Sequence, residues 1–222
     1  MCYSIESSLQ TSAISLLSIV YLLSSNIPHY QWLGIALIGW CGMQFDELLL
    51  WITEPRIECT KWNEIITMSL IPFTLVTQPV FSLWGSLYVF PWSKLSSLRK
   101  QLMIFYTIIC TLLIYFVHFY KPDKTCTTVT KDGHLSWGTT KYVSDSNIFV
   151  GIWAILIGLP LLVLWNKNYM IIYLIFIIPI FGYYYGKNTD SQGSIWCYYT
   201  SYTSIIASIA LFLHQTKIYS II

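Results

Sequence analysis

The stretch that decides the fold is Met43-Gln44-Phe45-Asp46-Glu47-Leu48-Leu49-Leu50-Trp51, in which two adjacent carboxylates lie inside an apolar run. The run covers residues 30–53, and at about 1.5 Å per residue a helix of this length crosses a hydrocarbon core of roughly 30 Å. A charge at that depth costs on the order of 2.5–3.5 kcal/mol, so it usually faces a partner or a cavity. We therefore expect a transmembrane helix that carries a polar site.

The two carboxylates point in different directions. Neighbouring residues are about 100° apart around a helix axis, so Asp46 and Glu47 cannot share one face. Glu47 is in line with Gln44 and Trp51 at helical spacing, whereas Asp46 lies on the adjacent face beside Gly42. Each carboxylate is therefore expected to meet a different neighbour.

The composition indicates an integral membrane protein. Hydrophobic residues make up 55% of the 222 residues, aromatic residues 17% and charged residues only 10%, and the mean hydropathy is +0.59. Soluble domains carry about 25% charged residues. The net charge of +2 and the absence of a basic cluster argue against a nucleic-acid partner, so the expected environment is a lipid bilayer.

Seven segments have the length and hydropathy of a membrane-spanning helix, and prolines, asparagines, glycines or charges separate them. The start of the chain has neither the basic region nor the cleavage site of a signal peptide, so we expect the first span to be retained. The sequence predicts one polytopic domain over residues 1–222, an all-α bundle of seven transmembrane helices. The predicted spans are 8–25, 30–53, 63–88, 101–119, 147–165, 169–186 and 194–214.

Charge and cysteine placement predict the orientation. The short loop 94–100 has only basic charges, which favours the cytoplasmic side and places the N-terminus outside and the C-terminus inside. Four cysteines then reach the outer side, where an oxidising compartment allows pairing. A pairing of Cys197 with either Cys59 or Cys126 is favoured, and four unrelated thiols are the alternative. The candidates are Cys2, Cys59, Cys126 and Cys197.

This orientation suits a membrane of the secretory pathway or a virion envelope. The sequence has no CxxC pair and its histidines are scattered, so we expect no metal site and no cofactor.

The third predicted span carries polar residues that could face the carboxylates. Pro72 and Pro79 interrupt this span, and each removes a backbone N–H and leaves a carbonyl unbonded. Transporters build binding sites from broken helices of this kind. Alternatively, the polar side chains only satisfy the freed carbonyls and hold the helices together. The polar stripe consists of Asn63, Thr67, Thr74, Gln78 and Ser82.

The predicted outer loop contains an Asp132-Gly133 turn signal followed by His134 and Trp137. A nucleophile group with His134 is one interpretation, but local spacing does not define a catalytic triad. The favoured interpretation is a lid that Trp137 packs over the helix bundle. The patterns therefore favour a non-enzymatic protein.

Several short motifs occur in a characteristic order over predicted spans two to seven. They are residues 47–51, Cys59 with Asn63 and Thr67, Gln78-Pro79, Cys126 with His134-Leu135-x-Trp137, and Gly193-Ser194-x-Trp196-Cys197. This order resembles an uncharacterised multi-pass membrane family of giant viruses and protists. The family has no established activity, so the resemblance implies a topology and no mechanism.

We expect a receptor- or transporter-like protein with a small polar pocket that opens outward. Glu47 would be its charged anchor beside Asp46, and the ligand would be a small polar or cationic molecule or a proton. One alternative is a structural protein of an envelope or organelle membrane, and another is an intramembrane hydrolase. The remaining pocket residues would be Asn63, Thr67 and Gln78 as the wall and Trp51 and Trp196 as the rim.

Overall fold

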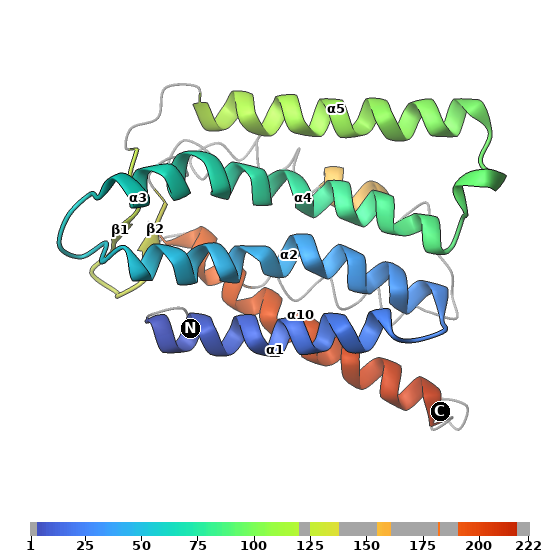
Figure 1. Cartoon of the computed structure of the whole chain (residues 1–222), viewed down its shortest axis with the longest axis horizontal. Helices are drawn as coiled ribbons and strands as arrows, with labels where there is room; N and C mark the ends of the chain where they lie inside the picture. Colours follow the sequence, from blue (N-terminus) through green and yellow to red (C-terminus); the bar gives the residue numbers. More distant parts are fainter. Residues whose placement is uncertain (1–3, 120–124, 138–154, 161–181, 183–190, 217–222) are drawn as a thin grey trace.

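The structure is a computed structural model, and it describes residues 4–119, 125–137, 155–160, 182 and 191–216. Long helices run side by side along one direction, and α10 crosses them obliquely (Figure 1). The described elements are α1 (Ile5–Leu23), α2 (Pro28–Ile52), α3 (Lys61–Ile65), the π-helix η1 (Ile66–Leu70), α4 (Ile71–Trp84), the 3₁₀ helices η2 (Gly85–Tyr88) and η3 (Trp92–Lys94), α5 (Ser97–Phe119), β1 (Thr128–Val129), β2 (Leu135–Ser136) and α10 (Gln192–Gln215).

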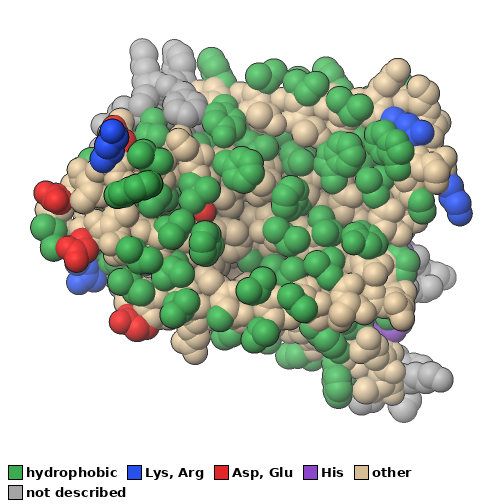
Figure 2. All heavy atoms as spheres, in the orientation of Figure 1, with side chains coloured by type: hydrophobic (Ala, Val, Ile, Leu, Met, Phe, Trp, Pro, Cys, Tyr) green, Lys and Arg blue, Asp and Glu red, His purple; other side chains and the backbone are tan. Residues whose placement is uncertain are grey.

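Five described segments are long and apolar enough to cross a membrane, which agrees with an all-α, multi-span membrane protein. Apolar side chains cover the middle of the face in Figure 2, and most of the visible charged side chains gather at its two ends. The predicted spans 147–165 and 169–186 lie almost wholly outside the described residues. The five segments are Ile5–Leu23, Pro28–Ile52, Lys61–Tyr88, Ser97–Phe116 and Gly193–Gln215.

Helix α2 is the centre of the bundle and contacts α1, α4 and α10. It begins at Pro28, whose fixed φ and missing N–H suit the first helical turn. It lies very close to α4 at Gly39, where an added Cβ would be 2.6 Å from the carbonyl oxygen of Thr77. Only glycine allows the two backbones to approach this closely.

A π-turn joins α3 to α4. The N–H of Ile71 donates to the carbonyl of Ile66, five residues earlier, and Pro72 follows directly with no N–H to donate. The insertion of an extra residue rotates the following helix relative to α3. The predicted polar stripe is nevertheless buried along its length, because Asn63, Thr67, Gln78 and Ser82 are 0% exposed and Thr74 is 5% exposed.

We call one end of the bundle the disulfide end and the other the basic end. The disulfide end carries residues 53–60 and 125–137, with the antiparallel β1–β2 hairpin and the start of α10. The basic end carries the connection between α4 and α5, which contains loop 94–100, and the end of α10 (Figure 1). The predicted separation of basic loop and paired cysteines onto opposite ends is therefore observed.

The disulfide joins Cys59 to Cys126 across 67 residues, with a Cα–Cα distance of 5.8 Å. The predicted pairing of Cys197 is wrong. Cys197 is 0% exposed and lies inside the bundle near the start of α10 as a thiol, where its backbone carbonyl contacts Gln44 of α2. Cys2 lies outside the described residues.

Candidate functional site

Helix α2 carries a group of polar side chains inside the bundle. Gln44 and Glu47 are 0% exposed and Asp46 is 2% exposed. Their positions follow from the packing of α2, because a helix enclosed on several sides buries more than one face. Burying charged or polar groups at this depth is costly unless they find partners. The partners of each side chain therefore define the site.

Asp46 faces α4. Thr74 hydrogen-bonds to its carboxylate, and Thr74 lies beside Gly42, where an added Cβ would be 3.2 Å from the Thr74 methyl carbon. The second carboxylate oxygen, Oδ2, has no hydrogen-bond partner among the described residues. Asp46 is thus a buried carboxylate with one hydrogen-bonding site open.

Gln78 lies one helical turn beyond Thr74 on the same stripe. Its side chain is 0% exposed, and neither Nε2 nor Oε1 has a hydrogen-bond partner among the described residues. The polar groups around it are already engaged, since Ser82 Oγ donates to the Gln78 carbonyl at 2.8 Å and Trp32 Nε1 donates to the Ser82 carbonyl at 2.8 Å. The Gln78 amide is therefore the most under-bonded polar group of the stripe.

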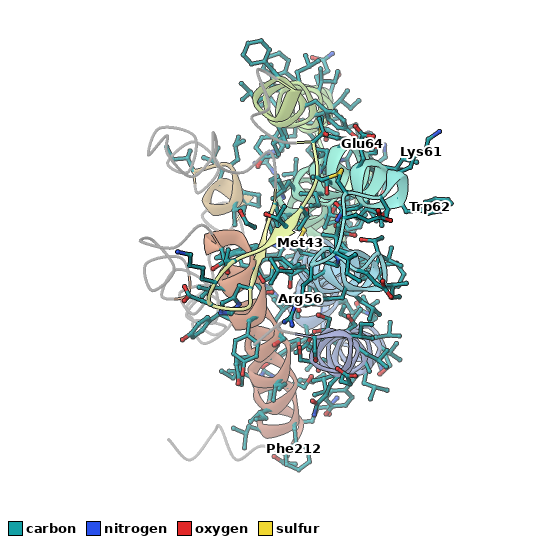
Figure 3. All side chains as sticks on the ribbon, turned by 90° about the vertical axis from the view of Figure 1, so that its left-hand side faces the viewer. Met43, Arg56, Lys61, Trp62, Glu64 and Phe212 are labelled. Carbon is teal, nitrogen blue, oxygen red and sulfur yellow. A yellow bond between two sulfur atoms is a disulfide. The ribbon has the colours of Figure 1, made fainter. Side chains whose placement is uncertain are left out.

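Glu47 is fully buried on the face of α2 that also carries Met43 and Trp51. At the disulfide end of this face, the guanidinium carbon of the exposed Arg56 lies 5.5 Å from the centroid of the Trp51 ring. Figure 3, which views that end, shows Met43 among the helices, whereas Lys61 and Trp62 point away from the bundle. Glu47 is therefore enclosed within the bundle.

Gln44 joins three helices. Its Nε2 donates to the carbonyl of Cys197 in α10, and its Oε1 accepts a hydrogen bond of 3.1 Å from Thr11 in α1. The sequence analysis placed Gln44 on the Glu47 stripe but gave it no role, and it did not select Thr11. The only signal in the sequence is their polarity inside apolar helices, because the partners are remote along the chain.

Asn63 and Thr67 form a closed network with Thr127 at the disulfide end. Asn63 Nδ2 donates to the Thr127 carbonyl at 3.0 Å, and the Thr127 N–H lies 2.9 Å from Asn63 Oδ1 and 3.1 Å from Thr67 Oγ1. The Thr67 and Thr127 hydroxyl oxygens are 2.8 Å apart. This network fixes the segment after Cys126 onto α3 and η1, so the two residues predicted for the pocket wall bind the protein's own backbone.

The predicted rim and lid residues pack inside the structure. Trp196 is 6% exposed, and its ring centroid lies 5.7 Å from that of Trp40. Trp137 is 3% exposed and its ring packs closely against Gly193 at the start of α10. Burial lowers the pKa of His134 below its usual value, and the nearby Asp132 charge opposes this shift.

The structure thus separates the predicted site residues into three groups. Asp46 of α2 and Gln78 of α4 lie where these two helices pack together, and Thr74 hydrogen-bonds to Asp46. Glu47 and Trp51 lie on another face of α2, and Trp196 lies against Trp40 of the same helix. Asn63 and Thr67 lie with Thr127 at the disulfide end.

Several surface cavities of about 370–610 Å³ lie on the described part of the chain, and none of these is lined by Asp46, Glu47 or Gln78. One of them holds about 610 Å³ at the disulfide end, between residues 55–59 and 127–131. Within the described ranges, no three His, Cys, Asp or Glu side chains are grouped closely enough to hold a metal ion. The buried polar groups of α2 and α4 are therefore the candidate site.

The chain matches no protein-family model, and no curated protein or solved structure is significantly similar to it. The geometry of the buried side chains is therefore the basis on which a function is inferred.

Proposed function

We propose that the protein is a receptor- or transporter-like multi-pass membrane protein that binds a small cation or a proton inside its helix bundle. The binding groups at the α2–α4 contact are the Asp46 carboxylate, the Thr74 hydroxyl and the Gln78 side-chain amide. Glu47, on a different face of α2, is proposed as a separate carboxylate site for a proton. The ligand is polar and small, because the site lies between closely packed helices.

The observation that carries this proposal is the open hydrogen-bonding capacity at the α2–α4 contact. Asp46 Oδ2 and both side-chain polar atoms of Gln78 are buried without a hydrogen-bond partner in the described part of the chain. An unsatisfied buried polar group costs about 1–3 kcal/mol. Leucine or methionine would fill the same space between α2 and α4 without this loss of free energy. Packing alone therefore does not explain the polar residues, whereas a binding role does.

The chemistry of these groups favours a cation or a proton. Carboxylate, amide and hydroxyl oxygens are the ligands that hard cations prefer, and Asp46, Thr74 and Gln78 supply one of each. The same oxygens accept hydrogen bonds from a small ammonium or guanidinium group. Neither α2 nor α4 carries a lysine or an arginine, so the negative charge of Asp46 favours a positive ligand.

Thermal unfolding of the purified protein in detergent tests the proposal. Sodium, methylammonium and guanidinium chlorides are titrated at constant ionic strength, with Asp46→Asn and Glu47→Gln as test variants. Glu64→Gln is the matched control, because Glu64 is exposed on α3. At least one cation should raise the unfolding temperature of the wild type and of the control, and this increase should saturate as the cation concentration rises. The same cation should not raise the unfolding temperature of at least one test variant.

A proton is tested separately in liposomes that carry a pH gradient. The wild-type protein should then dissipate the gradient and Glu47→Gln should not. If neither a cation nor a proton distinguishes the wild type from the variants, the proposal is wrong.

A structural role is the second candidate, and the satisfied networks favour it. Gln44 joins α1, α2 and α10, and Asn63 with Thr67 fixes the segment at Thr127. Polar residues of this kind hold helices together in a membrane. This candidate predicts that Glu47→Gln changes the unfolding temperature without changing any response to cations.

We further propose that the disulfide end faces the non-cytoplasmic side, in a secretory-pathway or virion envelope membrane. Support comes from the disulfide, which persists in oxidising compartments, and from the basic loop at the opposite end. The resemblance to the multi-pass family of giant viruses and protists stays part of this proposal. Labelling of a cysteine-free variant with single cysteines in loop 94–100 or residues 131–133 tests the orientation.

A further inference from the structure

A groove lies at the disulfide end where α2 ends and α3 begins. It holds about 490 Å³. Leu49, Ile52 and Ile66 form its apolar side along the two helices, and Glu54, Glu58 and Trp62 line it where the chain leaves the helices. The groove therefore runs from the apolar surface of two spans to the charged end of the bundle.

Three apolar side chains around this groove are exposed. Trp62 is 71% exposed, Ile57 75% and Ile52 57%. Figure 3 shows Trp62 pointing away from the helix bundle. Tryptophan concentrates at the boundary between hydrocarbon and headgroups in membrane proteins. The groove consequently lies at the headgroup level of the leaflet that surrounds the disulfide end.

The charge of the groove is negative. Glu54 and Glu58 are the charged side chains that line it, and both are exposed. Lys61 and Glu64, on the neighbouring helix α3, do not line it. A positively charged group in the groove would meet two carboxylates, and the indole of Trp62 offers it a negative ring face.

We propose that this groove binds a choline phospholipid of the surrounding leaflet. Its quaternary ammonium lies between the carboxylates of Glu54 and Glu58 and the ring of Trp62, and an acyl chain follows Leu49, Ile52 and Ile66. A quaternary ammonium has no N–H to donate, so carboxylate charge and an aromatic face are the groups that recognise it. An anionic lipid headgroup would meet two like charges and is disfavoured.

The test measures which lipid stays with the protein. The full chain is reconstituted into nanodiscs that contain equal amounts of phosphatidylcholine and phosphatidylglycerol, extracted gently into detergent, and its retained lipids are counted by native mass spectrometry. Phosphatidylcholine should be retained in preference to phosphatidylglycerol. Equal retention of the two lipids, or preference for phosphatidylglycerol, would overturn the proposal.

Two variants and a matched control locate the lipid. Glu58→Gln and Trp62→Ala should each lower the preference about three- to five-fold, the size expected for one charge or one cation–π contact near a surface. Glu64→Gln removes another exposed carboxylate, on α3 and outside the groove, and should leave the preference unchanged. A loss of preference in the control equal to that in the variants would overturn the location.

A soluble competitor distinguishes a lipid from a small water-borne cation. Phosphocholine added at millimolar concentration should not displace the retained lipid, because it cannot contact the apolar side of the groove. Displacement by phosphocholine would show that the headgroup alone occupies the site and would overturn the assignment to a membrane lipid.

Discussion

Replacement of Gln78 by methionine is predicted to stabilise the helix bundle. The two side chains have nearly the same shape, but methionine has no amide to leave unbonded. Gln78 is 0% exposed, and its Nε2 and Oε1 have no hydrogen-bond partner among the described residues. An unsatisfied buried polar group costs about 1–3 kcal/mol. Because Nε2 and Oε1 belong to the same amide, we count this cost once and expect Gln78→Met to raise the free energy of unfolding by about 2 kcal/mol.

Asn63→Leu is the matched control for this prediction. Asn63 is also a fully buried amide on the same polar stripe, but it exchanges hydrogen bonds of 3.0 and 2.9 Å with the backbone of Thr127. Leucine has the branched shape of asparagine but no amide, so it would leave the Thr127 carbonyl without its partner. The control should therefore lose about 1–3 kcal/mol of stability.

Both variants are measured by thermal unfolding in the same detergent, with intrinsic tryptophan fluorescence as the probe. For a protein of this size, a change of about 2 kcal/mol shifts the midpoint by about 4–8 °C. Gln78→Met should raise the midpoint, Asn63→Leu should lower it, and Gln78→Met should also lose the cation response proposed above. A decrease for Gln78→Met similar to that for Asn63→Leu would refute the argument that the Gln78 amide is under-bonded.

Three other predictions concern packing, the disulfide and pH. Gly39→Ala should destabilise the bundle by about 1–3 kcal/mol, because the new Cβ would lie 2.6 Å from the Thr77 carbonyl oxygen. Gly158→Ala is the control and should have little effect, because a Cβ added at Gly158 would have no atom within 4 Å. Cys59→Ser opens a loop of 67 residues and should cost about 4 kcal/mol in the chain-entropy description, measured by thermal unfolding against the oxidised wild type. Burial lowers the pKa of His134 in the folded protein. The free energy of unfolding should therefore be highest above about pH 6.5 and fall as the pH drops through the lowered pKa. His134→Gln should remove this pH dependence.

The helical spans and the buried stripe were predictable because both follow from local periodicity. Polar residues at spacings of four and seven lie on one helix face whatever the neighbours are, and the structure buries Thr74 and Gln78 as that pattern requires. The π-turn at Ile66–Leu70 was not predicted. Its signal is Pro72, which was interpreted only as an interruption of the helix.

Contacts between distant residues were not predictable in the same way. Gln44 bonds to Thr11 and to Cys197, which are 33 and 153 residues away. The pairing of Cys59 with Cys126 depends on how the hairpin segment folds onto α3, and the sequence does not contain this connectivity. Cys197 was assigned to the surface because its span was predicted to begin at residue 194, whereas in the structure its side chain points into the bundle.

The enclosure of Asp46 and Glu47 is tested most directly by carbodiimide labelling of the protein in liposomes, followed by peptide mass spectrometry. Glu58 and Glu64 are internal standards, because both carboxylates are exposed at the disulfide end. A water-soluble carbodiimide should modify Glu58 and Glu64 and spare Asp46 and Glu47, whereas membrane-permeant dicyclohexylcarbodiimide should modify at least one of the two buried carboxylates. Modification of Asp46 and Glu47 by the water-soluble reagent at the rate of Glu58 would contradict a polar site enclosed within the membrane bundle.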